Sequence, residues 1–172
     1  YMSHSFIAQG WSLVALTLLA FSSSAATLKI GVVGPFSGPY SLFGDQLWQG
    51  ADQAAKQANA QGGIHEQAIE LIKMDDQCDP KLAKKVAQEL VEKHKVVAVL
   101  GHFCSSASMP ASSVYANKQV IMMTPSSTLP KLTDQGFETV FRVCGRDDHQ
   151  GRVAARFIHE HLRACLLYTS DA

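Results

Sequence analysis

The sequence predicts an α/β fold in which helices cover both faces of a parallel β-sheet. Three observations lead to this fold class. From residue 28 onward, short β-rich runs alternate with longer segments whose apolar residues recur at helical spacing. Helices of this length between strands are typical of βαβ units, whose parallel strands are buried on both faces. With 172 residues, of which 47% are hydrophobic, the chain is long enough to bury one core.

The first predicted strand covers Leu28–Val33, and a helix is predicted to follow over Asp45–Gln61. The helical segment is rich in alanine and glutamine, and its apolar residues recur three and four positions apart. Gly62 then stands where a helix C-terminal cap is expected. A second strand is predicted over Ala68–Met74, which completes one strand–helix–strand unit.

The rest of the chain repeats this alternation. Asp79 followed by Pro80 indicates a helix start, because aspartate caps helix N-termini and proline fits the first helical position. The elements predicted from there, in chain order, are a helix over Pro80–His94, a strand over Val96–Leu100, a helix over Ser108–Lys118, strands over Val120–Met123 and Thr139–Val143, and a helix over Gln150–Leu162.

The two ends of the chain differ from this pattern. An uncharged apolar run, Trp11–Phe21, is too short to span a bilayer and is followed by small residues up to Ala26. This order is typical of a secretory signal peptide, so we expect residues 1–26 to be removed on export. Residues 165–172 show neither a helical stripe nor a strand pattern, and we interpret them as a non-native tail.

Composition argues against a nucleic-acid partner. The formal net charge is zero, and no run of lysine and arginine stands out. A nucleic-acid-binding domain normally carries a basic patch that contacts phosphates.

Loops of one kind follow three of the predicted strands. They cover Gly34–Gly44, Gly101–Ser106 and Thr124–Pro130, are rich in glycine, proline and hydroxyl residues, and contain no lysine or arginine. In open α/β sheets, ligands bind outside the carboxyl ends of the strands. Hydroxyls together with free N–H groups at a helix start can hold a carboxylate. These loops therefore predict a small-ligand site, although serine and threonine also serve simply as helix caps.

Other kinds of site fit the residues less well. The glycines at 31, 34 and 38 have neither the dinucleotide nor the P-loop spacing. No nucleophile-elbow motif surrounds Cys104 or Ser105, although a secreted hydrolase using either residue stays an alternative. No recognised metal-ligand spacing is present, and we expect no metal and no cofactor. Cys78 follows the second strand and Cys104 the third, so adjacent strand ends could bring the two thiols within bonding range.

From about Leu28 to Leu162 the chain resembles the periplasmic binding proteins for branched-chain amino acids, which serve ABC importers. The matching stretches, in order, are GVVGPFSGPYSLFGDQLWQGADQA, QGGI, MDDQCDPKLA, GHFCSSASMPASSVYA, MMTPSSTLPKLT and RVCGRDDHQG. The resemblance implies a type I periplasmic binding protein fold, with two lobes that close on the ligand. Residues 27–164 then form the N-terminal lobe, and the second lobe lies beyond this chain.

The resemblance also implies roles for individual residues. The disulfide of the family falls on Cys78 and Cys104, and Cys144 has no partner in that pattern. The ligand-carboxylate contacts fall on Ser105 and Thr128, with a main-chain contact from Ser126. The full set of implied ligand-binding positions is Phe43, Phe103, Cys104, Ser105, Ser126, Ser127 and Thr128.

Some of these positions depart from the family. Phe43 stands in place of a tyrosine, and Phe103 in place of an aliphatic residue. The expected function is capture of leucine, isoleucine or valine in the periplasm by a monomer that delivers it to an inner-membrane ABC permease. A relative or sensor that binds amides, urea or another amino acid is the alternative among binding proteins.

Overall fold

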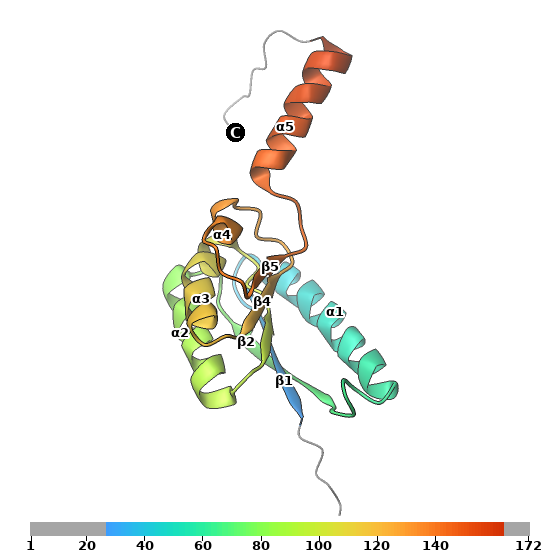
Figure 1. The fold of residues 1–172 in the computed structure, drawn as a ribbon, viewed down its shortest axis with the longest axis vertical. Coiled ribbons are helices and arrows are strands. Elements are labelled where there is room, and N and C mark those ends of the chain that lie inside the picture. Colours follow the sequence, from blue (N-terminus) through green and yellow to red (C-terminus); the bar gives the residue numbers. More distant parts are fainter. Residues whose placement is uncertain (1–26, 164–172) are drawn as a thin grey trace, which may run out of the picture.

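In the computed structural model, which describes residues 27–163, five parallel strands form one sheet with helices on both faces (Figure 1). The strand order is β2-β1-β3-β4-β5, and all four pairings are parallel. The strands are β1 (Leu28–Gly34), β2 (Ile69–Asp75), β3 (Ala98–Leu100), β4 (Ile121–Thr124) and β5 (Val140–Arg142). The predicted fold class is confirmed, and each strand lies within two residues of its predicted bounds.

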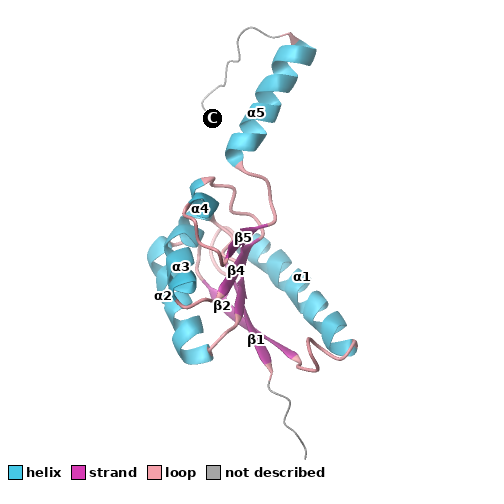
Figure 2. Ribbon diagram, in the orientation of Figure 1, coloured by secondary structure: helices cyan, strands magenta, loops and turns pink. Residues whose placement is uncertain are grey.

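The helices lie in two layers. Helix α1 covers one face of the sheet, and α2 and α3 lie side by side on the other (Figure 2). The helical elements are α1 (Ser41–Ala60), α2 (Pro80–Glu89) with its π-helical continuation η1 (Leu90–His94), α3 (Ser105–Asn117), α4 (Lys131–Asp134), and α5 (Asp147–Phe157) with its π-helical continuation η2 (Ile158–Leu162). The four-residue α4 is an element that the sequence pattern did not predict.

The main core lies between the sheet and the α2–α3 layer. Its largest fully buried apolar side chains include Leu90, Tyr115 and Met122. Gly31 lets η1 approach the sheet closely, because a Cβ atom at this position would lie 3.0 Å from Leu90 Cδ1. A side chain at Gly31 would therefore force Leu90 to move within a densely packed interior.

Helices α1 and α3 begin earlier than predicted. Helix α1 starts at Ser41 instead of Asp45, after a turn in which Gly38 adopts a φ of +77°. Its first turn lies close to the preceding loop because Gly44 has no Cβ atom. A Cβ atom at this position would overlap the Pro35 carbonyl. Helix α3 starts at Ser105 instead of Ser108. Phe43 and Ser105 therefore lie on helices and not in loops.

The predicted start of α2 is confirmed. Asp79 is its N-cap residue, and its Oδ1 accepts a hydrogen bond of 2.7 Å from the Leu82 N–H group. Pro80 occupies the first helical position, as its missing N–H group favours.

Helix α5 extends away from the rest of the described chain, and none of its residues is buried (Figure 1). The sequence pattern grouped this helix with the lobe as a sheet-covering element, but it covers no part of the sheet. On the face opposite the main core, the strand residues Ile121, Met123 and Phe141 are between 39% and 46% exposed.

Two interpretations of the sequence, the signal peptide over residues 1–26 and the tail over 165–172, lie outside the described residues. Within 27–163, the structure contains no helix that is both long and apolar enough to span a membrane. The same stretch of chain contains no group of three or more histidine, cysteine or acidic side chains placed to hold a metal ion.

Candidate functional site

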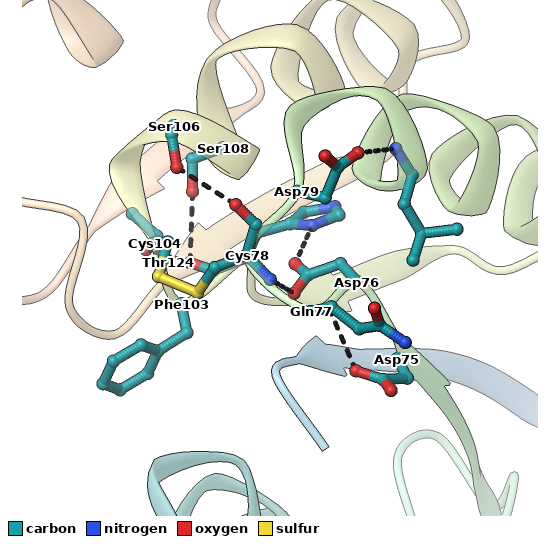
Figure 3. Close-up of polar contacts among 12 residues, drawn as sticks. Asp75, Asp76, Gln77, Cys78, Asp79, Phe103, Cys104, Ser106, Ser108 and Thr124 are labelled. Carbon is teal, nitrogen blue, oxygen red and sulfur yellow. Dashed lines mark hydrogen bonds and ion pairs between the residues drawn. A yellow bond between two sulfur atoms is a disulfide. The ribbon is translucent and has the colours of Figure 1, made fainter. Parts of the chain in front are cut away.

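A disulfide between Cys78 and Cys104 joins the loop before α2 to the start of α3 (Figure 3). The expected pairing is confirmed, but the assumption of adjacent strands was wrong, because β1 lies between β2 and β3. The two cysteines meet because α2 and α3 pack against each other on one face of the sheet. Their Cα atoms are 5.4 Å apart, a usual separation for a disulfide.

Asp75, at the end of β2, holds the loop that follows β1. Its carboxylate accepts hydrogen bonds from the Phe36 N–H group at 2.8 Å, the Ser37 hydroxyl at 2.5 Å and the Gln77 N–H group at 3.0 Å. Partial burial acts to raise the pKa of Asp75, but these hydrogen bonds outweigh it and hold the pKa below its ordinary value. The Gly/Pro/Ser loop is therefore fixed to the neighbouring strand end.

A buried chain of hydrogen bonds lies beneath the disulfide. His102 Nδ1 lies 2.6 Å from Asp76 Oδ2, and His102 Nε2 lies 3.0 Å from the Tyr115 hydroxyl. The other oxygen of Asp76 accepts a hydrogen bond of 2.9 Å from the Cys78 N–H group. Asp76, His102 and Tyr115 are all fully buried. The sequence analysis did not connect these three residues.

Hydroxyl groups from α3 and from the end of β4 converge on two carbonyls. The His102 carbonyl accepts from Ser108, Thr124 and Ser127 at 3.1, 2.7 and 3.2 Å. The Phe103 carbonyl accepts from Ser126 and Ser127 at 2.7 and 3.1 Å. These bonds join the segment after β3 to the segment after β4.

The two predicted carboxylate contacts, Ser105 and Thr128, lie on these joined segments. Ser105 is the first residue of α3, and its Oγ accepts a hydrogen bond of 3.4 Å from the Leu129 N–H group. Thr128 is half-buried, and its hydroxyl makes no hydrogen bond within residues 27–163. Both hydroxyls retain a proton to donate. The Ser126 hydroxyl is engaged with Phe103, which agrees with a main-chain role at this position.

An aromatic pair connects α1 to the segment after β3. Phe43, on α1, stacks on Phe103 with a centroid distance of 5.2 Å and an interplanar angle of 24°. Phe43 is 44% exposed, and Phe103 is partly buried. The pair forms an apolar surface next to the hydroxyl-rich segments.

Arg142 was missed by the sequence analysis. From β5, its guanidinium donates to the Ser127 and Leu129 carbonyls at 2.9 and 2.8 Å and to the Thr133 hydroxyl at 2.6 Å. It thus fixes the segment that contains Thr128. A charged residue inside an otherwise apolar strand was the signal available in the sequence.

Comparison with known proteins gives a family for this arrangement. Residues 27–172 match the family model described as periplasmic binding protein. The chain belongs to the periplasmic binding protein family. The resemblance found in the sequence is thereby confirmed.

The relatives of this periplasmic binding protein include named amino-acid-binding proteins. An "Amino acid binding protein" of Pseudomonas aeruginosa is 47% identical over 154 residues, which cover 89% of this chain and 41% of the relative. The "Leu/Ile/Val-binding protein" of Escherichia coli is 42% identical over 147 residues, which cover 84% and 40%. The chain therefore spans about 40% of the length of these curated relatives.

A solved structure agrees with this relationship. The branched-chain amino acid transporter substrate binding protein LivJ of Streptococcus pneumoniae, in complex with isoleucine, superposes with a TM-score of 0.74 at 32% identity. The match covers 80% of this chain and 39% of that one.

Two of the predicted site residues of this binding protein have other tasks in the structure. Ser127 is fully buried, and its hydroxyl is hydrogen-bonded to the segment after β3. The sulfur of Cys104 is bound to Cys78, so Cys104 has no thiolate to act as a nucleophile. Both ring nitrogens of His102 are engaged, so this imidazole is not available to activate Ser105. The geometry therefore disfavours the hydrolase alternative.

Proposed function

We propose that this chain is the N-terminal part of a solute-binding protein that captures leucine, isoleucine or valine for uptake by an ABC transporter. The observation that carries the proposal is the position of Ser105 and Thr128 on two joined strand-end segments that lack lysine and arginine. Relatives named for leucine, isoleucine and valine binding support the choice of ligand.

The site is suited to the carboxylate of a free amino acid. The hydroxyls of Ser105 and Thr128 each donate one hydrogen bond, and the main chain at Ser126 donates another. The N-terminus of the thirteen-residue helix α3 also favours a negative charge, because its first N–H groups form the positive end of the helix dipole. Hydrogen bonds to a charged acceptor are stronger than those between neutral groups. A carboxylate is thereby bound without a cationic side chain.

Specificity for an apolar side chain follows from the aromatic pair. Phe43 and Phe103 offer exposed apolar surface beside the carboxylate donors. An aliphatic ligand side chain that covers this surface removes it from water, at about 25 cal/mol per Å² buried. A polar side chain would gain nothing from this contact.

The remaining parts of the proposal concern partners and location. The ligand is closed in by a second lobe, which also contacts its ammonium group. An inner-membrane ABC permease receives the ligand from a monomeric binding protein. The periplasm is the proposed location, because the expected signal peptide precedes the lobe and the disulfide is of the kind that persists in oxidising compartments.

Isothermal titration with L-leucine tests the carboxylate contacts in the complete two-lobed protein. Ser105→Ala and Thr128→Ala each remove one donor to a charged group, an interaction worth about 1.5–3 kcal/mol. The dissociation constant should therefore rise roughly ten- to hundredfold in each variant. The melting temperature of the ligand-free protein should hardly change.

The matched control is Ser113→Ala, also on α3. The Ser113 hydroxyl donates to the Pro110 carbonyl of its own helix at 3.1 Å, away from the strand ends. Its loss should leave leucine affinity unchanged. Equal leucine affinity in the Ser105→Ala and Ser113→Ala variants would show that the hydroxyls serve only as helix caps.

A further inference from the structure

We propose that Asp76, His102 and Tyr115 are positioning residues that fix the ligand-contacting segments after β3 and β4 relative to each other. Only the test by leucine titration rests on the proposed function. The residues come from three parts of the chain: Asp76 follows β2, His102 follows β3, and Tyr115 lies near the end of α3. All three are fully buried.

The carboxylate of Asp76 accepts hydrogen bonds at both of its oxygens. One oxygen accepts from Cys78 N–H and the other from His102. A carboxylate can only accept, so Nδ1 of His102 carries a proton, and Nε2 pairs with the Tyr115 hydroxyl. Burial, followed by the charge of Asp76, raises the pKa of Tyr115, so this hydroxyl keeps its proton.

The orientation of the His102 ring is fixed from both sides. Hydrogen bonds to Asp76 at 2.6 Å and to Tyr115 at 3.0 Å hold the imidazole in one plane. The same residue presents its carbonyl to three hydroxyl groups, those of Ser108, Thr124 and Ser127. The side-chain bonds of His102 thus determine where its carbonyl lies.

The His102 carbonyl is connected through hydrogen bonds to the segment after β4 that contains Thr128. The Thr124 hydroxyl, which donates to the His102 carbonyl, also accepts from the Ser127 N–H group at 3.1 Å. Thr128 lies between Ser127 and Leu129 in the chain. The N–H group of Leu129 donates to Ser105 Oγ. A shift of the His102 carbonyl therefore changes the separation of the Ser105 and Thr128 hydroxyls.

Amide hydrogen exchange on the ligand-free chain tests this without any ligand. Tyr115→Phe removes one hydroxyl and keeps the ring, so exchange at Ser127 and Leu129 should become about three- to tenfold faster, as expected for one lost hydrogen bond. The matched control is Ser112→Ala. Ser112 is also fully buried on α3, but its hydroxyl bonds to the Met109 carbonyl and to Gln135, away from His102. If Tyr115 only stabilised the core, the Tyr115→Phe and Ser112→Ala variants would show the same exchange rates at Ser127 and Leu129. That result would overturn the proposal.

A double-mutant cycle adds a second readout. The amide of asparagine in His102→Asn can still donate to Asp76 but has no atom in the place of Nε2 to pair with Tyr115. This variant should match Tyr115→Phe, and the double variant should be no worse than either one. Additive effects of the two changes on amide exchange would contradict the proposal that His102 and Tyr115 act through one series of hydrogen bonds.

Leucine titration of the complete protein separates this inference from the proposed function. The dissociation constant of Tyr115→Phe should rise about three- to tenfold, with Ser112→Ala unchanged. If the unaltered protein bound no leucine while the exchange effect was present, the proposed function would fail and the positioning role would stand. Unchanged leucine affinity in Tyr115→Phe would instead refute the positioning role.

Discussion

Loss of the Cys78–Cys104 disulfide should destabilise the fold markedly. The bridge closes a loop whose ends are 26 residues apart and joins the loop before α2 to the start of α3. For a loop of this length, the chain-entropy model gives a loss of about 3.5 kcal/mol in the free energy of unfolding. Domains of this size are stable by only about 5–15 kcal/mol, so this loss is a large fraction of the total.

Urea unfolding followed by circular dichroism measures this loss. The experiment uses a Cys144→Ser background, because Cys144 is the one remaining cysteine within residues 27–163 and could exchange with the bridge. With an m value of about 2 kcal/mol per molar urea, reduction should lower the midpoint by roughly 1.5–2 M. A variant that also lacks Cys78 and Cys104 is the control, and it should not respond to the reductant. Coincident midpoints for the oxidised and reduced protein would refute the reasoning.

Two further predictions concern the strand-end segments. Because the pKa of Asp75 is lower in the folded chain than its unfolded value of about 3.9, the carboxylate stabilises the fold above that pH, and the contribution is lost as pH falls through the folded pKa. Acid titration of stability should therefore be less steep for Asp75→Asn below about pH 4, and an unchanged slope would contradict this. Arg142→Lys cannot reproduce the three hydrogen bonds of the guanidinium and should lower the unfolding free energy by about 1–3 kcal/mol in the same urea assay, whereas Arg152→Lys on exposed α5 should have no effect.

The alternation of strands and helices was predictable because each element depends on local patterns. The Asp79–Pro80 helix start is one example, since a cap and a proline act within one turn. The early start of α1 was not predictable from apolar spacing. It depends on the turn at Gly38 and on close contact between Gly44 and the preceding loop, and that contact is a tertiary feature.

The sheet order and the site were only partly predictable. Neighbours in sequence are not always neighbours in a sheet, so the position of β1 between β2 and β3 was missed although the disulfide was expected. A serine-rich stretch does not reveal which hydroxyls face a ligand. Ser127 is buried and Thr128 is not, because the Ser127 hydroxyl bonds to carbonyls of the segment that follows the preceding strand, β3. The contact between His102 and Tyr115 likewise exists only after α3 has packed on the sheet.

The most direct test of the central claim compares L-leucine with L-leucinamide by isothermal titration against the complete two-lobed protein. The two ligands share the ammonium group and the side chain, and they differ in the carboxylate. We expect L-leucine to bind in a one-to-one complex and L-leucinamide to bind at least tenfold more weakly, because the donors around Ser105 and Thr128 then face a neutral amide. Equal binding of the two ligands, or no binding of L-leucine, would contradict the proposal that this lobe captures a branched-chain amino acid through its carboxylate.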